Sequence, residues 1–324
     1  MPESSKKINM VQAINLALRE EMRRDKNIVI LGEDIGLDGG VFRVTDGLLK
    51  EFGAERIVDT PLEESGIVGT AIGMAVYGLR PIAEIQFMGF TYAAVEQIYS
   101  HATRIRSRSR GRYTCPLVIR TPYGAGIKPP ELHSESAEAL FCHMPGVKVV
   151  VPSTPYIAKG LLISSIRDPG PVIFLESTRL YRLIKEEVPE GEYTIPLGKA
   201  RIVQEGKEVT LIAWGSMLHR ALQAVEGIDA EVIDLMTLSP FDEETLLRSV
   251  KKTGRVVIVH EAPKTCGFGA EISATIAEDA MLYMKAPVMR VTGYDAVMPL
   301  PKLEDHYVPT FERIRKTIEE IMKY

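Results

Sequence analysis

Short apolar segments that alternate with helical patterns are the feature that most constrains how this chain can fold. A first segment, NIVIL at 27–31, is followed by five others that begin within residues 56–176: RIVD, PIAEIQF, PLVIR, VKVVVP and PVIFLE. The helical patterns between them lie near 44–52, 65–78, 91–106, 135–142 and 155–167. Uninterrupted apolar strands that alternate with helices are typical of a parallel sheet covered on both faces. We therefore predict an α/β fold.

One more helix is predicted ahead of the first strand, over about residues 9–24. Asn9 can cap its start, and Gln12 can reach back to the backbone of the cap. The apolar face of this helix would carry Val11, Ile14 and Leu18.

Apolar segments also alternate with helical patterns in the second half of the chain, which is smaller. The stretch after Glu176 is polar, punctuated by Pro and Gly and without a clear period, which is typical of a linker. Four apolar segments then follow with helical patterns between them: VTLIAWG, AEVIDLM, RVVIVHE and PVMRVTG. Because 324 residues exceed what one hydrophobic core usually supports, we predict two domains. The N-terminal domain is predicted at 1–185 and a smaller α/β domain at 201–324, with a linker at 186–200 between them.

Composition narrows the classes of function. A net charge of −4 argues against binding nucleic acid through a broad positive field, and no apolar run reaches the roughly 18 residues of a membrane span. The opening MPESSKKINM carries no export signal, and three scattered cysteines make no disulfide framework. We expect a cytoplasmic protein, or a mitochondrial matrix protein if the chain is a processed eukaryotic one.

Several common catalytic signatures are absent from the sequence. There is no GxxxxGK[ST] phosphate loop, no HExxH and no GxSxG. The nearest match to a dinucleotide fingerprint, CGFGAEI at 266–272, lacks the third glycine and lies several residues after its strand. A nicotinamide-dependent dehydrogenase is therefore disfavoured.

The stretch DTPLEESGIVGTAIGMAVYGLRP at 59–81 places two adjacent carboxylates ahead of a segment rich in Gly and Ala. A helix is predicted to begin at Glu64 or Ser65. Small residues would form one face of it and let another helix approach closely: Gly66, Gly69, Gly73 and Ala75. Carboxylates in a first helical turn interact favourably with the helix dipole, so both could be simple helix-end charges. A glutamate on a packed, water-poor surface could instead share a proton with a buried nitrogen heterocycle.

The same stretch, continued through IAEIQFMGF, resembles the β subunit of the E1 component of thiamine diphosphate-dependent 2-oxo acid dehydrogenases. Three further blocks resemble this family: NIVILGEDIG, ELHSESAEALFCHMPGVKVVVPSTPYIAKGLLISSIRDPGPVIFLE and HEAPKTCGFGAEISATIAED. The blocks follow the family's order over about residues 10–324. The resemblance implies a transketolase-like architecture, with a pyrimidine-binding domain, a C-terminal domain, and α subunits in an α2β2 assembly.

The resemblance also separates the two glutamates. The family activates its cofactor through a carboxylate hydrogen-bonded to N1′ of the aminopyrimidine ring. That carboxylate matches Glu64, whereas Glu63 lies where the family varies.

Further site residues are implied in the same way. Phe90 matches an aromatic that stacks on the aminopyrimidine, and His133 matches a histidine that faces the substrate and the incoming lipoyl group. Residues implied to line or shape the cofactor pocket are Leu62, Gln86 and Tyr92.

Metal ions and partners follow from the resemblance too. Thiamine enzymes hold Mg²⁺ and the diphosphate with a GDG motif, and the nearest match here is TDG at 45–47. The α subunit is therefore expected to hold both, and this chain is expected to be active only with it. A K⁺ site, formed in some relatives largely by backbone carbonyls, matches Leu117, Ser165, Ile166, Asp168 and Gly170.

The segment RIRSRSRGRYT at 104–114 departs from the family, which has a Ser-Gly-Gly loop here. Its five arginines alternate along the chain: Arg104, Arg106, Arg108, Arg110 and Arg112. Alternation places them on no single helical face, so we predict a solvated, partly extended segment. A contact with an anion or an acidic partner is the alternative.

The predicted function is that of an E1 β subunit. Such an enzyme decarboxylates a 2-oxo acid, branched-chain or pyruvate, and transfers the acyl group to a lipoyl-bearing E2 acyltransferase. An acetoin dehydrogenase β subunit carries motifs that we cannot separate from these. A non-catalytic scaffold subunit is an alternative of a different class.

Overall fold

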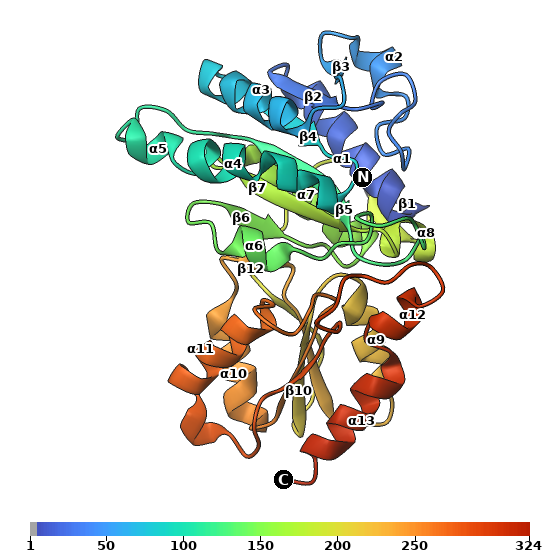
Figure 1. Ribbon diagram of the computed structural model, residues 1–324, viewed down its shortest axis with the longest axis vertical. Coiled ribbons are helices and arrows are strands. Elements are labelled where there is room, and N and C mark those ends of the chain that lie inside the picture. Colours follow the sequence, from blue (N-terminus) through green and yellow to red (C-terminus); the bar gives the residue numbers. More distant parts are fainter. Residues whose placement is uncertain (1–4) are drawn as a thin grey trace.

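The computed structural model describes residues 5–324 and contains two main sheets, one above the other along the long axis (Figure 1). The larger sheet has the strand order β12-β6-β7-β5-β4-β2-β3 and is parallel except at β12. Its strands are β2 (Ile28–Gly32), β3 (Ile57–Asp59), β4 (Arg80–Glu84), β5 (Val118–Tyr123), β6 (Lys148–Val150), β7 (Val172–Ser177) and β12 (Thr237–Ser239). The predicted α/β fold with a parallel sheet is confirmed.

Apart from a short helix at Leu180–Leu183, which was not predicted, the helices of this half lie where the sequence patterns put them, with one exception. They are α1 (Met10–Arg24), α2 (Leu48–Phe52), α3 (Glu64–Tyr77), α4 (Val95–Gln97), α5 (Ile105–Arg108), α6 (Glu138–Cys142), α7 (Pro155–Arg167) and α8 (Leu180–Leu183). The predicted capping box at the start of α1 is present, with Asn9 and Gln12 exchanging hydrogen bonds. The exception is 91–106. It was predicted as one helix but is divided into a 3₁₀ segment, α4, a π-helical turn and α5.

The second sheet has the order β14-β13-β10-β11-β9 and forms the smaller half of the molecule. Its strands are β9 (Arg201–Gln204), β10 (Val209–Ala213), β11 (Ala230–Asp234), β13 (Val256–Val259) and β14 (Met289–Val291). Its helices are α9 (Ser216–Ala224), α10 (Glu243–Thr253), α11 (Gly269–Asp279), α12 (Glu304–Tyr307) and α13 (Phe311–Ile321). Within residues 5–324, no helix combines the length and apolar character needed to cross a membrane.

Two strand pairings connect segments that the sequence patterns did not join. The short strand β12, from the second half of the chain, pairs with β6 at the edge of the first sheet. Near the N-terminus, β1 (Ser5–Ile8) pairs with β8 (Glu186–Pro189), which lies inside the stretch predicted as a linker. The predicted domain boundaries remain predictions, and residues 1–4 of the first domain lie outside the described residues.

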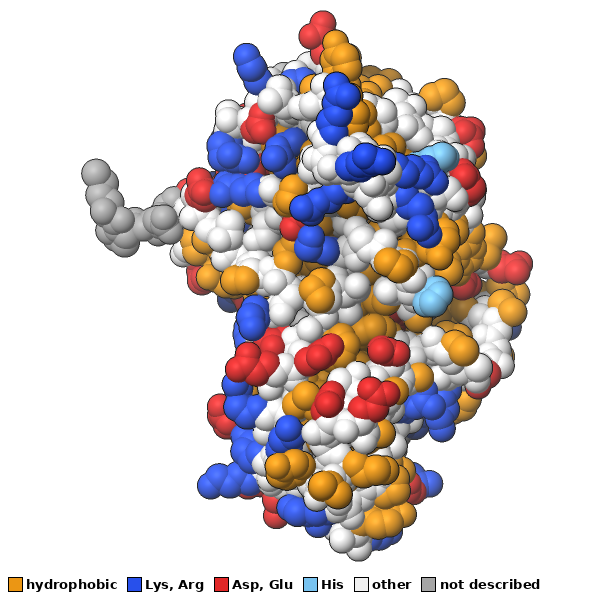
Figure 2. All heavy atoms as spheres, turned by 90° about the vertical axis from the view of Figure 1, so that its left-hand side faces the viewer, with side chains coloured by type: hydrophobic (Ala, Val, Ile, Leu, Met, Phe, Trp, Pro, Cys, Tyr) orange, Lys and Arg blue, Asp and Glu red, His pale blue; other side chains and the backbone are white. Residues whose placement is uncertain are grey.

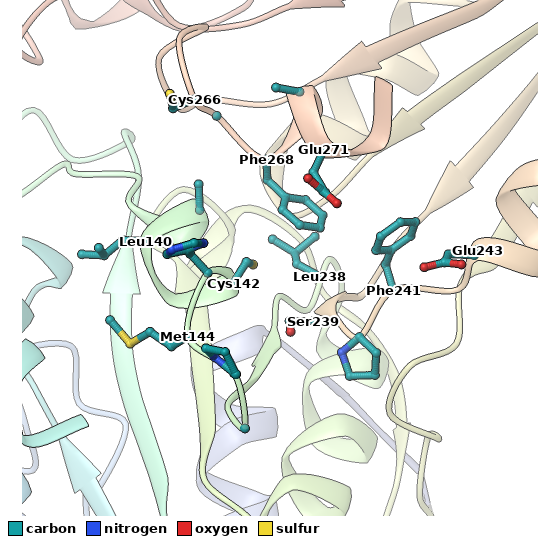
Figure 3. Close-up of a pocket in the computed structure, with 17 residues that line it drawn as sticks. Leu140, Cys142, Met144, Leu238, Ser239, Phe241, Glu243, Cys266, Phe268 and Glu271 are labelled. Atoms are coloured by element: carbon teal, nitrogen blue, oxygen red, sulfur yellow. The ribbon is translucent and has the colours of Figure 1, made fainter. Parts of the chain in front are cut away.

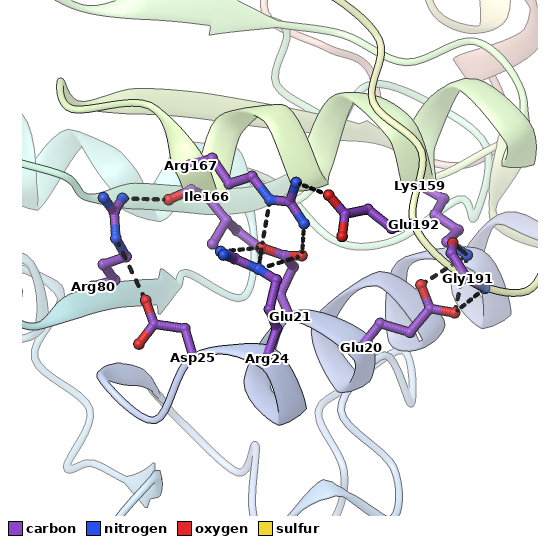
Figure 4. Close-up of polar contacts among 10 residues, drawn as sticks. All are labelled: Glu20, Glu21, Arg24, Asp25, Arg80, Lys159, Ile166, Arg167, Gly191 and Glu192. Atoms are coloured by element: carbon purple, nitrogen blue, oxygen red, sulfur yellow. Dashed lines mark hydrogen bonds and ion pairs between the residues drawn. The ribbon is translucent and has the colours of Figure 1, made fainter.

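Buried ion pairs hold α1 against α7 on one face of the first sheet (Figure 4). The Lys159 ammonium is fully buried, lies 2.8 Å from the Glu20 carboxylate and donates to the Gly191 carbonyl. Glu21, which is 2% exposed, pairs with Arg167 at 2.5 Å. Because removing one partner of a buried pair leaves an uncompensated charge, these contacts fix how the 186–192 segment crosses the two helices.

Polar contacts also connect the two halves of the molecule. The backbone amide of Ala125 donates to the Glu261 carboxylate (3.0 Å), and that of Gly126 donates to Glu304 (3.0 Å). Beside them, the fully buried Glu138 of α6 accepts a hydrogen bond from the indole of Trp214 (3.3 Å). Burial raises the pKa of Glu138 to about 7, because a charged carboxylate is poorly solvated there.

We expect Glu138→Gln to stabilise the protein at alkaline pH. The folded state holds the Glu138 proton more tightly than the unfolded state does. Its contribution to stability is therefore complete below about pH 4.5 and is lost as the pH rises to about 7, a change of roughly 3 kcal/mol. Thermal unfolding measured from pH 4.5 to 8 should give the variant a higher Tm than the native protein at pH 8 and a similar Tm at pH 4.5. An unchanged difference in Tm across this range would contradict the assignment.

Candidate active site

The polar side chains of the candidate site follow the carboxyl ends of four adjacent strands. In the first sheet, β3, β2, β4 and β5 are neighbours and run parallel. Glu33 follows β2, Glu64 follows β3, Gln86 follows β4, and the loop with His133 follows β5. Open parallel α/β sheets bind their ligands just outside the carboxyl ends of the strands.

The structure gives the two adjacent glutamates different tasks. Glu63 is the N-cap residue of α3, and its carboxylate accepts a hydrogen bond from the backbone amide of Gly66 (2.7 Å). Glu64 is the first residue of the helix. Across residues 5–324, its carboxylate takes part in no hydrogen bond or ion pair. The cap uses one carboxylate and leaves the other available.

Glu33 is a neighbour of Glu64 that the sequence analysis did not assign. It is only 7% exposed, and its pKa is raised by burial and, to a smaller extent, by the charges of Glu64 and Asp34. Asp34 in turn accepts a hydrogen bond from the Gln86 amide (3.3 Å). The available signal was the GEDIG segment directly after a buried strand. Neighbouring carboxylates repel each other when all are ionised. A ligand that shares a proton with one of them would therefore bind favourably here.

Two phenylalanines and His133 form an aromatic cluster at the same edge. The centre of the His133 ring lies 4.4 Å from the centre of the Phe87 ring and 5.1 Å from that of the Phe90 ring. Its Nδ1 lies 2.7 Å from the Glu131 carbonyl oxygen, which can only accept a hydrogen bond. The Nδ1 atom therefore carries the proton in the neutral ring, and Nε2 is left free to accept one.

The loop that carries His133 rests closely on the segment 88–94. A Cβ atom on Gly89 would clash with the Leu132 carbonyl oxygen. The Tyr92 hydroxyl donates to the Glu135 carboxylate (3.1 Å). Glycine at position 89 thus permits the approach that places His133 beside the two phenylalanines.

We expect Gly89→Ala to displace this loop and destabilise the protein by about 1–3 kcal/mol, as overpacking typically does. Gly73 provides the matched control, because a Cβ there would meet nothing within 4 Å. Gly73→Ala should therefore leave stability unchanged or slightly increased, since alanine favours the helix. Denaturant unfolding of both variants tests this, and equal stabilities would contradict the proposed role of Gly89.

Other predicted features differ from the structure. Leu62 is 77% exposed, and its predicted place in the cofactor pocket stays a prediction. From the sequence, Ser134 or Ser136 is also expected to cap the helix that follows His133, and this expectation is wrong. That helix begins at Glu138 without a side-chain cap. The small-residue face of α3 is also narrower than predicted, because Ala75 is buried while Gly66 and Gly73 are exposed.

The residues matched to a K⁺ site lie close together, but their oxygens already have partners. The Leu117 carbonyl accepts from the Val172 amide, and the Ile166 carbonyl accepts from the Arg80 guanidinium (2.9 Å; Figure 4). The Lys148 ammonium lies 2.9 Å from the Asp168 carboxylate. Two side-chain cations thus contact two of these residues, and the K⁺ site stays a prediction.

The TDG segment is used structurally. The buried Thr45 hydroxyl donates to the Ile35 carbonyl (2.7 Å), and Gly47 adopts a positive φ of 78° at the start of α2. Among residues 5–324, no three His, Cys, Asp or Glu side chains are placed to hold a metal ion. The described part of the chain therefore supplies a carboxylate and aromatic surface and no metal-binding set.

Comparison with known proteins agrees with this arrangement. Residues 6–184 match the family "Transketolase, pyrimidine binding domain", and residues 198–314 match "Transketolase, C-terminal domain". The chain is 48% identical over 322 residues to the pyruvate dehydrogenase E1 component subunit beta of Bacillus subtilis, covering 98% of this chain and 99% of that protein. The chain belongs to the family of 2-oxo acid dehydrogenase E1 β subunits.

Other relatives extend the comparison of this E1 β chain. The subunit of the same name from Acholeplasma laidlawii is 50% identical over 321 residues, covering 98% of each chain. A solved structure, a split-gene transketolase in an inactive β4 tetramer, superposes with a TM-score of 0.78 at 23% identity. It covers 98% of this chain and 99% of its own and supports the transketolase-like fold. This family uses thiamine diphosphate.

Proposed function

We propose that this chain is the β subunit of an E1 enzyme that decarboxylates a 2-oxo acid and passes the acyl group to lipoyl-E2. One observation carries the proposal at the site: Glu63 caps α3, and the Glu64 carboxylate has no hydrogen-bond or ion-pair partner among residues 5–324. Near-50% identity over almost the whole length to subunits named pyruvate dehydrogenase E1 β supports it. Those names favour pyruvate as substrate, and a branched-chain acid remains the competing candidate.

Three groups of the chain would perform the chemistry. Thiamine diphosphate, when bound, supplies the carbon nucleophile and the electron sink for decarboxylation. Glu64 would hold a proton at the N1′ nitrogen of the pyrimidine. Glu33 lies near it, and the repulsion between the two carboxylates would disfavour a state in which both are charged. Phe90 would stack on the ring and exclude water, and Gln86 and Leu62 would line the pocket. His133, with Nε2 free, would exchange a proton with the substrate or the acyl acceptor.

The diphosphate and Mg²⁺ would be held by an α subunit in an α2β2 assembly. The reason is that the TDG segment is structural and that residues 5–324 offer no metal-binding cluster. The chain alone should then be inactive. A structural K⁺ ion at the matched residues would lie beside the Arg80 and Lys148 side chains. The two relatives named above are bacterial, which supports the predicted cytoplasmic location.

Reconstitution tests the proposal. The chain is purified with and without its α subunit, supplied with thiamine diphosphate and Mg²⁺, and assayed for 2-oxo acid-dependent reduction of an artificial electron acceptor. Pyruvate and 3-methyl-2-oxobutanoate are compared side by side. We expect activity only when both subunits are present, and the preferred acid identifies the complex. Activity of the α subunit alone, equal to that of the assembly, would make this chain a scaffold and refute the proposal.

A further inference from the structure

The segment between β5 and α6 that carries His133 has no regular secondary structure, so its shape depends on contacts with its surroundings. We call residues 124–135 the His133 loop. Within it, Lys128 and Leu132 adopt positive φ angles of 53° and 66°. L side chains rarely adopt this conformation, and it persists only where the surrounding structure holds it. Other parts of the chain must therefore impose the shape of the His133 loop.

Hydrogen bonds fix the two ends of the His133 loop. The Gly124 amide donates to the Glu135 carbonyl (2.9 Å), which closes the loop at its base. The Thr178 hydroxyl, just after β7, donates to the Gly124 carbonyl (2.9 Å). These contacts determine where the loop begins and ends, and the course of residues 126–133 depends on further contacts.

One carboxylate from the second half of the chain holds the middle of the His133 loop. Glu304, the first residue of α12, is 2% exposed. Each of its two oxygens accepts a backbone amide: Oε1 accepts from Gly126 (3.0 Å) and Oε2 from Lys128 (3.1 Å). Figure 1 shows α12 at the end of the second half that faces the first. Because hydrogen bonds to a charged acceptor are strong, this one side chain fixes the positions of two loop amides.

A stiff segment connects this anchor to the imidazole. Pro129 and Pro130 follow Lys128 directly, and only two residues separate them from His133. A proline ring fixes φ near −65°, so the segment has few conformations available. A displacement of Lys128 would therefore move His133 away from the Phe87 and Phe90 rings, because the segment between them cannot absorb it.

Elsewhere the boundary between the two halves is open. A hollow of about 890 Å³ lies there, lined by residues of α6 and α11 (Figure 3). Figure 2, which faces this side, shows hydrophobic side chains between Lys and Arg above and Asp and Glu below. Glu271 of α11 lines the hollow, and its carboxylate has no hydrogen-bond or ion-pair partner within residues 5–324. The second half thus does not pack closely along the whole boundary, and specific contacts such as those of Glu304 hold the loop.

We propose that Glu304 is a positioning residue for His133. Its buried carboxylate holds the His133 loop, through the Gly126 and Lys128 amides, in the conformation that brings the imidazole to the two phenylalanines. Glu304 itself touches neither substrate nor cofactor, and it acts only through the loop. This inference rests on the proposed function, from which it takes the proton-transfer role of His133.

Hydrogen exchange of the full chain tests the anchoring without substrate or cofactor. Mass spectrometry follows the peptides that span residues 124–135. We expect Glu304→Ala to speed exchange in these peptides at least about tenfold, because two loop amides lose their acceptor and the loop opens more often. Glu304→Gln keeps one acceptor oxygen and should give an intermediate rate, and it replaces the alanine variant if that chain does not fold.

Two controls separate the buried carboxylate from negative charge in general. Asp305 is the next residue of α12, and its exposed carboxylate pairs with the Lys128 ammonium at 2.7 Å. Exposed ion pairs contribute little, so Asp305→Asn should leave exchange in the loop at the native rate. Glu271→Gln removes a charge that faces the hollow without contacting the loop, and it should also exchange like the native chain.

Activity of the reconstituted enzyme tests the link to His133. We expect Glu304→Ala to lower kcat by about 10- to 100-fold and to change KM for the 2-oxo acid by less than about threefold, because it misplaces a reacting group and leaves substrate binding intact. Added to His133→Ala, the same substitution should change kcat by less than about twofold, since two residues that act through one step are not additive.

Native exchange rates at residues 124–135 in the folded Glu304 variants would overturn the inference. So would an additive fall in kcat when Glu304→Ala is combined with His133→Ala, or native activity of His133→Ala alone. An inactive native assembly would instead refute the proposed function. The exchange experiment would then still decide whether Glu304 holds the loop, because it needs no activity.

Discussion

Replacing Glu64 by glutamine should reduce the 2-oxo acid-dependent activity of the reconstituted enzyme by about 10²- to 10⁴-fold, the usual contribution of a positioned acid–base group. Glutamine has nearly the same shape but cannot take up a proton at the pH of the assay. Because Glu64 accepts no hydrogen bond from the described part of the chain, the fold should not depend on its charge. Assembly with the α subunit and the Tm should therefore stay close to native, and only turnover should fall.

The adjacent carboxylate is the natural control. Glu63→Gln retains an oxygen that can accept the hydrogen bond from the Gly66 amide, so α3 should begin as before and activity should stay within a few-fold of native. Equal activities of the two variants would remove Glu64 from the catalytic site. A fall in both would point to the start of α3 as a structural requirement, without a special role for Glu64.

Replacing Arg120 by methionine should cost about 3–5 kcal/mol of unfolding free energy, the typical effect of breaking a buried ion pair. Arg120 is 1% exposed and donates to Glu176 at 2.7 and 2.9 Å and to Glu84 at 2.6 Å. These three side chains come from the neighbouring strands β5, β7 and β4. Without the guanidinium, two carboxylates remain buried at the centre of the sheet with no positive charge near them.

Urea unfolding at neutral pH measures this loss. Arg248→Met is the control, because Arg248 is exposed and contacts only Thr245 at 3.4 Å, so its loss should change stability by no more than about 0.5 kcal/mol. The cost of Arg120→Met should shrink in acid, where protonation removes the buried negative charges. A loss below about 1 kcal/mol at neutral pH would mean that the carboxylates are neutral in the native protein.

Local chemistry explains what could be predicted from the sequence. The Asn9–Gln12 capping box involves only four consecutive residues, and α1 begins where that pattern predicts. The parallel strands are mostly apolar, so β2 to β7 could be recognised one by one. Glu64 and His133 were identified through a family resemblance, and their roles stay predictions until they are measured.

Features that depend on distant contacts could not be predicted in this way. Glu33 becomes notable only because α3 brings Glu64 to the end of β2, and one strand end in a sequence says nothing about its neighbours. The helix predicted at 91–106 has a suitable composition, but packing divides it into four short segments. The hydroxyls of Ser134 and Ser136 have the right chemistry for a cap, yet the loop beside Gly89 turns them into the interior.

The strand β12 has a consequence for the order in which the protein is made. It covers the edge of the first sheet at β6, although it follows three strands of the second sheet along the chain. On the ribosome, the first half must therefore wait with one edge of β6 unpaired until Ser239 has emerged, and an uncovered edge invites pairing with other chains. A cut in the polar stretch near residue 190 would make that exposure permanent. The two halves of this subunit are interlocked, and neither could be exchanged between relatives without carrying β12 along.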